Sequence, residues 1–226
     1  MTPHAPDAFP VAAAPATTHR VIPSRFPPVS AFEAVGKAED LAAVMELEGW
    51  TNDRLVAHRL RRLDPAEWVF GRSNASVVMA AFLHGGVEGS RFASPDLGAW
   101  YAAGSNITAL VEVLSGVRRE VAASGLNEAT GEWREYTARL TGTFVDIRGA
   151  APDLHDPASH AAGQAFGEAV RASPRAGIAY DSVRHAGGAC FVSYRPRRIL
   201  DVVQARHWRA RVPLRGKVFV ERLDAG

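Results

Sequence analysis

GSRFASPDLGAWYAAGSNITALVEV, residues 89–113, contains one arginine, one tyrosine and one glutamate at nearly even spacing. Turn-forming and small apolar residues separate Arg91, Tyr101 and Glu112. The three side chains could belong to ordinary strands and a helix that happen to carry polar residues, or they could form the walls of one polar pocket. Local patterns decide the secondary structure of this stretch, whereas the pocket needs support from elsewhere in the chain.

The stretch predicts two short strands followed by a helix. Residues 91–93 and 99–103 have strand composition, and the SPDLG segment between them is typical of a turn. A helix is expected over residues 106–123, with Ser105 or Asn106 as its N-cap.

The expected helix has one apolar face. The residues that share this face at helical spacing are Ile107, Leu110, Val113, Leu114, Val117 and Val121. Glu112 lies roughly opposite them, so we do not expect it in the main core. Periodicity alone leaves open whether Glu112 meets water or a cleft.

The rest of the chain predicts helices mostly before strands. Helices are expected at residues 38–49, 51–62, 74–86 and 158–173, and a short one after Asp64-Pro65. Strands are expected at residues 19–23, 133–149 (one strand, or two around Gly142), 177–180, 189–194, 199–203, 207–212 and 217–223. Because the helices do not alternate with the strands, an α+β domain with a mixed sheet is favoured over a doubly wound sheet. We expect a flexible leader over residues 1–17 and a single domain over residues 18–226.

Composition limits the classes of function. The 226 residues are 47% hydrophobic and 22% charged with a net charge of +2, which is ordinary for a globular protein. The arginines are scattered, so direct binding of nucleic acid is not expected, and no segment has the roughly 18 apolar residues that a membrane span needs. The N-terminus has no signal-peptide pattern, and we expect a cytoplasmic protein.

The strong motifs of nucleotide-binding and hydrolytic enzymes are absent from the sequence. Neither GxxxxGK[ST], GxGxxG after a strand, nor GxSxG occurs. His155 and His160 of HDPASH could form a metal pair, but Pro157 disfavours a common helical face, so no metal site is expected. Cys190 is the only cysteine, and we expect a buried apolar residue instead of a nucleophile.

The ordered set of polar residues resembles the RES domain family, which is named for its arginine, glutamate and serine. Residues 90–113 resemble the arginine-aromatic segment, the tyrosine strand and the glutamate helix of that family. GIAYDSVRHAGG (177–188) resembles its late serine motif. HRVIPSRFPP (19–28) and TNDRL (51–55) resemble segments of longer members, so the resemblance covers nearly the whole chain from about residue 18.

The resemblance implies a fold similar to that of ADP-ribosyltransferase toxins. RES proteins are typically toxins of bacterial toxin–antitoxin pairs, and their partner is an Xre-type helix-turn-helix antitoxin. Characterised members use NAD as a substrate, by hydrolysis, by phosphorolysis or by transfer of ADP-ribose to a protein. No metal is needed. The resemblance does not choose among water, phosphate and a protein as the acceptor.

The positions that match functional residues of the family are Arg91, Tyr101, Glu112 and Ser182. The resemblance implies catalytic roles for Arg91, Glu112 and Ser182. It implies that Arg91 and Tyr101 bind NAD.

A further NAD-binding arginine is expected early in the chain. Arg20 of HRVIP matches the arginine of the family's first strand, whereas Arg54 of TNDRL belongs to a segment that shorter members lack. Val21 stands where some members have an aromatic residue after that arginine.

The chemistry of these side chains agrees with the implied roles. Cleavage of the nicotinamide–ribose bond passes through a transition state with oxocarbenium character, which the carboxylate of Glu112 can stabilise. Arginine forks bind the oxygens of a pyrophosphate, and Tyr101 offers a ring for stacking. The alternative functions are a catalytically silent RES-fold module that binds a partner protein, and an RNA-directed toxin. The second lacks a visible basic and aromatic groove.

Overall fold

The computed structural model describes residues 4–25, 32–37, 40, 59 and 62–223. The helices whose bounds lie within these residues are the 3₁₀ turns η1 (Pro6–Ala8), η2 (Pro65–Glu67), η3 (Pro152–His155) and η4 (Pro196–Arg198), and the α-helices α3 (Ala75–Leu83), α4 (Asn106–Ala123) and α5 (Ala161–Ala172). The strands within these residues are β1 (Val11–Ala12), β2 (Thr18–Pro23), β3 (Trp100–Ala103), β4 (Glu128–Leu140), β5 (Phe144–Asp146), β6 (Gly177–Asp181), β7 (Ala189–Ser193), β8 (Ile199–Pro213) and β9 (Phe219–Leu223). Within this described part, no helix is long and apolar enough to cross a membrane.

The described strands form one mixed sheet in the order β1-β5-β6-β7-β3-β2-β4-β8-β9. β5 and β6 run parallel, and the remaining neighbours run antiparallel. This sheet and its helices confirm the expected α+β class. The narrowest junction joins β2 to β3, which share the single register pair His19↔Ala103. On its other edge, β2 pairs with β4 over its whole length, from Thr18 to Pro23.

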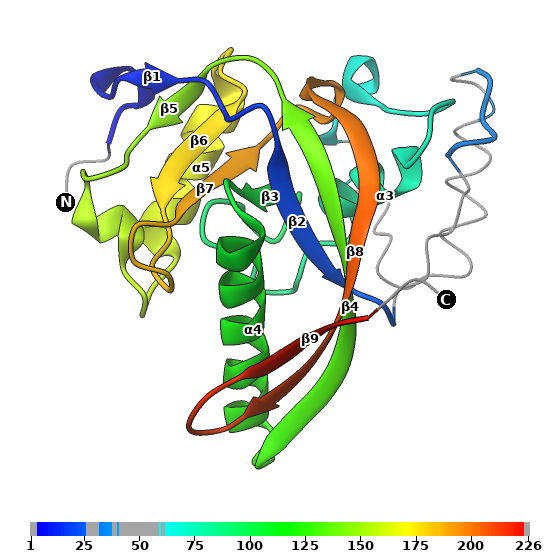
Figure 1. The fold of residues 1–226 in the computed structure, drawn as a ribbon. Coiled ribbons are helices and arrows are strands. Elements are labelled where there is room, and N and C mark those ends of the chain that lie inside the picture. The colour runs from blue at the N-terminus through cyan, green and yellow to red at the C-terminus, as the bar shows by residue number, and fades with distance from the viewer. Residues whose placement is uncertain (1–3, 26–31, 38–39, 41–58, 60–61, 224–226) are drawn as a thin grey trace.

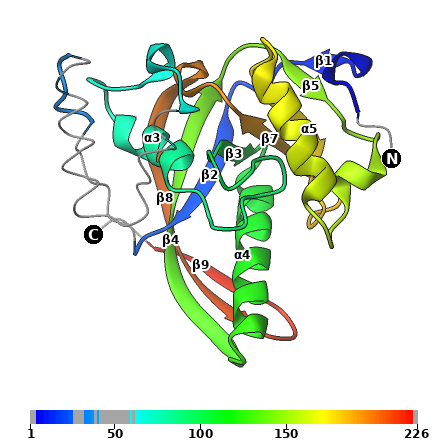
Figure 2. The ribbon, with the colours of Figure 1, turned by 180° about the vertical axis from the view of Figure 1, so that it is seen from behind.

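Both faces of the sheet are covered. On one face, α3 contributes Val78, Met79 and Phe82 to a core that also contains Trp100 of β3 and Tyr136 of β4. On the other face, α4 and α5 pack over a second core, and both helices stand in the foreground of Figure 2. Beyond this body, β4, β8 and β9 continue as a long ribbon alongside α4 (Figure 1).

Most elements predicted from the sequence are confirmed in the described residues. Those found close to their expected bounds are β2, η2, α3, β3, α4, α5, β6, β7 and β9. The 133–149 segment forms two strands, β4 and β5, on either side of Gly142, and β4 begins five residues earlier than predicted, at Glu128. The predicted helices at 38–49 and 51–62 lie almost entirely outside the described residues.

Three local predictions differ from the structure. The expected strand at 91–93 is wrong, because Ser90 and Ala93 bond to each other across a tight turn. The separate strands expected at 199–203 and 207–212 are one strand, β8, because β4 pairs along its length and holds the two halves together. Within the leader, β1 pairs with β5, where the sequence predicts a flexible segment.

Fewer residues of the predicted apolar face of α4 are buried than expected. Leu110, Leu114 and Val121 are buried as predicted, but Ile107 is 58% exposed. Ile107 lies in the first turn of the helix, which begins directly after the Ser105 N-cap.

Two glycines bring α5 into contact with the backbone that precedes β3. A Cβ atom at Gly163 would lie 2.3 Å from the carbonyl oxygen of Arg91, and one at Gly167 would lie 2.0 Å from that of Phe92. The Tyr194 hydroxyl donates to the same Phe92 oxygen at 2.6 Å. The glycines that lower the helix propensity of α5 therefore allow a helix–backbone contact that no larger residue permits.

We predict that Gly167→Ala destabilises the protein, although alanine is the better helix former. The overlap with the Phe92 carbonyl should lower the free energy of unfolding by about 1–3 kcal/mol in urea denaturation. The matched control is Gly116→Ala in α4, where the nearest atom is the Arg119 side chain, 3.9 Å from the added Cβ. That substitution should be neutral or stabilising by up to about 1 kcal/mol. Equal effects at both positions would contradict the close-approach explanation.

Candidate functional site

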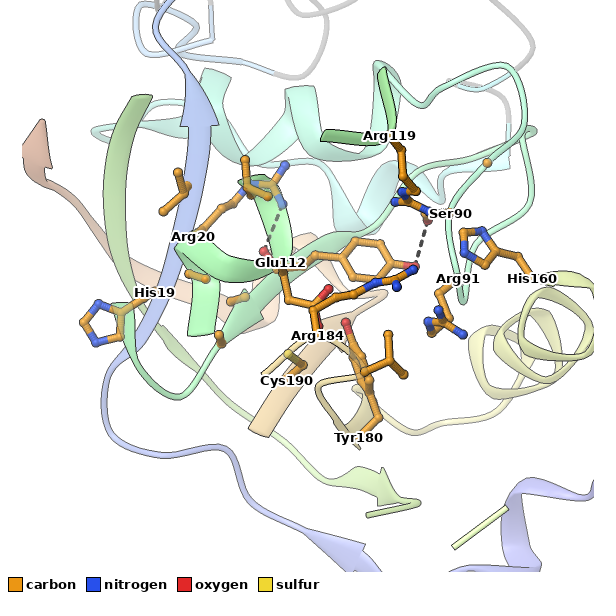
Figure 3. A pocket seen from close by; sticks show the side chains of 18 residues that line it. His19, Arg20, Ser90, Arg91, Glu112, Arg119, His160, Tyr180, Arg184 and Cys190 are labelled. Carbon is orange, nitrogen blue, oxygen red and sulfur yellow. Dashed lines mark hydrogen bonds between the residues drawn. The ribbon is translucent and has the colours of Figure 1, made fainter. Parts of the chain in front are cut away.

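A cavity of about 310 Å³ opens on the α4 side of the β2–β3 junction. It is lined by residues from β2, the turn before β3, β3, α4, the start of α5 and the loop between β6 and β7 (Figure 3). The polar and reactive side chains among them are His19, Arg20, Ser90, Arg91, Tyr101, Glu112, Arg119, His160, Tyr180, Arg184 and Cys190. Arg91, Tyr101 and Glu112 of the 89–113 stretch therefore contribute to the walls of one pocket.

Glu112 is held by a serine that follows β6. The Ser182 hydroxyl donates to Oε1 of Glu112 at 2.5 Å. The same Ser182 oxygen accepts the backbone N–H groups of Arg184, at 3.2 Å, and His185, at 2.9 Å. Ser182 is 9% exposed and lies behind Glu112 instead of on the cavity wall. It fixes one carboxylate oxygen and leaves the other without a partner among the described residues.

The loop that carries Ser182 is tied to the first turn of α4. His185 Nδ1 bonds to the Thr108 hydroxyl at 2.9 Å, and Thr108 bonds to the N-cap residue Ser105 at 2.9 Å. Gly188 is required at the end of the loop, because a Cβ there would lie 2.7 Å from the methyl group of Thr108. The helix and the loop therefore position Glu112 together.

Arg91 is anchored by the loop before α5. It is 9% exposed, and its Nη1 donates to the carbonyl oxygens of Asp156, at 2.6 Å, and Leu154, at 3.5 Å. Burial lowers the pKa of Arg91, an effect that the nearby Glu112 opposes. No ion pair joins Arg91 directly to Glu112, so the two charges face the cavity separately. The Nε and Nη2 donors of Arg91 have no hydrogen bond within the described residues.

Tyr101 fixes the turn that precedes β3. Its hydroxyl oxygen accepts from the Ser90 hydroxyl at 2.8 Å and from the Phe92 backbone N–H at 2.9 Å. A phenol has two acceptor positions and one O–H donor, so its hydroxyl can still donate to a ligand. Burial raises the pKa of Tyr101, which keeps that proton in place at neutral pH.

Arg20 occupies the junction between β2 and β3. Its Nη1 donates to the Tyr101 carbonyl at 3.0 Å, and its guanidinium lies 4.8 Å from the centre of the Trp100 ring. Nε of Arg20 is buried and has no hydrogen-bond partner. Burial lowers the pKa of Arg20 to about 10, so the side chain is still a cation at neutral pH.

The charge of the cavity is strongly positive. Arg20, Arg91, Arg119 and Arg184 line it, and Glu112 is the carboxylate among the lining residues. Such a surface suits an anion with several phosphate oxygens. Burial raises the pKa of the Cys190 thiol to about 12, so this cysteine is not a thiolate nucleophile, as the sequence predicted.

The structure brings most, but not all, of the predicted site residues to the cavity wall. Arg20, Arg91, Tyr101 and Glu112 line the cavity, Ser182 supports Glu112 from behind, and Arg54 lies outside the described residues. Sequence reasoning missed Arg119, although it stands seven residues after Glu112, a spacing that keeps two side chains on one face of a helix.

His155 and His160, weighed as a metal pair in the sequence, have separate surroundings. His155 Nδ1 bonds to the Ala151 carbonyl at 3.2 Å, and its Nε2 accepts the Asp181 N–H at 3.3 Å. His160 lines the cavity instead. Across the described part of the chain, no group of three or more His, Cys, Asp or Glu side chains could hold a metal ion.

Comparisons with known proteins place the chain in a family. An uncharacterized protein of Sinorhizobium fredii, y4oC, is 33% identical over 141 residues, which are 60% of this chain and 59% of that protein. The match thus spans less than two thirds of the relative. A chain in the crystal structure of the M. tuberculosis MbcT–MbcA toxin–antitoxin complex is similar with a TM-score of 0.45 and 16% identity, over 88% of this chain and 89% of that chain. The family model of the RES domain matches residues 56–213, which include the 89–113 stretch and Ser182, and the protein therefore belongs to the RES domain family.

Proposed function

We propose that this protein is an enzyme that cleaves the nicotinamide–ribose bond of NAD. The observation that carries the proposal is the Glu112 carboxylate, held by the Ser182 hydroxyl at 2.5 Å and directed into a cavity lined by four arginines. A fixed carboxylate stabilises the positive charge that develops on the ribose as the bond breaks, and it does so without reorganising during the reaction. Nicotinamide leaves as a neutral molecule, so no metal is required to withdraw charge.

The cavity offers complementary groups for the rest of the dinucleotide. Arg20 and Arg91 have guanidinium donors without partners among the described residues, and these donors can bind the pyrophosphate. Tyr101 keeps its O–H donor and its ring for the nicotinamide or the ribose. Ser182 acts through Glu112 and is a positioning residue.

We also propose that this activity makes the protein the toxin of a toxin–antitoxin pair. Membership of the RES family supports this role, and an Xre-type helix-turn-helix antitoxin is the partner that the family resemblance implies. The acceptor of ADP-ribose can be water, phosphate or a protein side chain. In the alternative, a silent binding module, Glu112 and Ser182 would have no chemical task.

We predict that Glu112→Gln strongly slows the cleavage. The substitution keeps the size of the side chain and its bond to Ser182 but removes the charge, so release of nicotinamide from NAD should fall about 10²-fold or more. The matched control is Glu120→Gln on the same helix, where the side chain is exposed and does not line the cavity. Its rate should equal that of the wild type. Retention of activity in Glu112→Gln would refute the assigned role of this carboxylate.

We predict that expression of the protein in a bacterium lowers cellular NAD before growth stops. The Glu112→Gln variant, expressed to the same level, should change neither NAD nor growth. Mass spectrometry of cell extracts over the first generations after induction measures NAD, nicotinamide and ADP-ribose. Growth arrest with unchanged NAD would favour a binding module or another toxic activity instead.

A further inference from the structure

Hydrolysis by the proposed mechanism needs a proton acceptor. When water captures the ribosyl cation, it must lose a proton. Glu112 is already bound by Ser182 and is assigned to stabilise the cation, so a second group that takes the proton leaves the charge of Glu112 unchanged. The other residues of the cavity wall are therefore the candidates for this base.

Several groups on the cavity wall are unsuitable as that base. Burial raises the pKa of Tyr180 well above its usual value and that of Cys190 to about 12, so neither ionises near neutral pH. Tyr101 is also held as the neutral phenol by burial. His19 bonds through Nδ1 to the buried carboxylate of Glu135 at 2.7 Å, and Figure 3 shows its ring directed away from Glu112 and Arg184.

His160 remains, and its position suits the task. It is the residue that immediately precedes α5, and its ring lines the cavity beside Arg91 (Figure 3). Its ring nitrogens have no hydrogen bond to any described residue, so a nitrogen is available to a ligand or a water molecule. A cavity of about 310 Å³ is at the lower end of the range for small-molecule sites, so one bound molecule can reach several of its walls.

The charges around His160 keep it neutral. Burial lowers its pKa, and the cations Arg91 (before β3), Arg119 (α4) and Arg184 (β6–β7 loop) lower it further. Glu88, in the loop after α3, opposes this effect. A neutral imidazole at pH 7 can accept a proton, whereas an imidazolium cannot. The same arginines favour ionisation of a nearby water molecule.

We propose that His160 is the general base of NAD hydrolysis in this protein, and that water is the acceptor. The inference rests on the proposed function. The bond between the nicotinamide nitrogen and ribose C1 breaks, and both electrons leave with nicotinamide. A water oxygen then bonds to C1, and its proton passes to a ring nitrogen of His160 and from there to solvent. The products are nicotinamide, ADP-ribose and one proton.

Variants of His160 test this assignment in purified protein. His160→Asn should lower kcat for nicotinamide release about 10²-fold and leave the affinity for ADP-ribose within a few-fold. His207→Asn is the control, because His207 lies on β8 and bonds to Ser24 away from the cavity lining. The wild-type rate should fall as the pH drops through the depressed pKa of His160, below about 6.5, and His160→Asn should lack this acidic limb.

Azide gives a readout that a purely structural role of His160 would not change. Azide is already deprotonated and needs no base, so it should raise nicotinamide release in His160→Asn more than in the wild type, with formation of ADP-ribosyl azide. If His160→Asn keeps both the wild-type rate and the acidic limb, the inference is wrong while the proposed function stands. A wild type that turns over only with added inorganic phosphate also overturns it. A wild type that releases no nicotinamide refutes the proposed function as well.

A spectroscopic titration keeps the proposal falsifiable if the His160 variants do not fold. The His160 ring resonances of the wild type report its pKa directly. They are assigned by through-bond connection to the backbone of His160 and Ala161, which needs no variant. We expect a pKa below about 6.5 that rises when ADP-ribose is added, because its phosphates offset the arginines. A pKa at or above the usual value in the free protein would overturn the assignment.

Discussion

The bond from the Arg20 guanidinium to the Tyr101 carbonyl determines how the centre of this sheet is built. β2 and β3 share only the pair His19↔Ala103, and beyond it the Tyr101 oxygen accepts a side-chain N–H where a continuous ladder would supply a backbone one. The guanidinium also packs on the Trp100 ring at this junction. An open junction at the middle of a sheet is costly unless its polar groups are satisfied, and here a single arginine satisfies the carbonyl and brings a positive charge to the cavity.

The remaining features of the site follow from this junction. α4 begins three residues after β3 ends, so the helix passes over the junction and carries Glu112 and Arg119 on one face. The loop after β6 closes against the first turn of α4 and holds Glu112 through Ser182. The start of α5 reaches the backbone at Arg91 because Gly163 has no side chain. The chain connection to β3 thus places α4, whereas close contacts fix the β6–β7 loop and α5, which are distant in sequence.

Local patterns in the sequence predict the elements but not all of their connections. β3 and α4 are predictable because small apolar residues, an N-cap serine and an apolar stripe are local signals. The turn at 90–93 is not, because the partner of its Phe92 N–H is the hydroxyl of Tyr101, nine residues away. β8 is one strand because of its pairing with β4, and the gap between its two apolar segments conceals this. The glycines of α5 lower helix propensity, and only the packed structure shows the contact that they permit.

The site residues also divide into those that the sequence predicts and one, His160, that it does not. Arg91, Tyr101 and Glu112 could be predicted as one set through their order and the family resemblance, and the structure brings them to one cavity. His160 could not, because the sequence offered it only as a partner of His155 in a metal pair, which Pro157 disfavoured. Its surroundings depend on where α5 begins relative to Arg91, Arg119 and Arg184.

The arginines have two effects in the mechanism that we propose, and the effects reinforce each other. Burial and these arginines lower the pKa of His160 and keep it neutral, ready to accept a proton. When a dinucleotide binds, its phosphates offset part of that positive charge, and the basicity of His160 rises at the step where a proton must be taken up. Substrate binding would then strengthen the base that the reaction uses. A protein with the same arginines but a permanently protonated cation at position 160 could not deprotonate water there, so an unprotonated base at this position is what the proposed hydrolysis adds to a site that binds NAD.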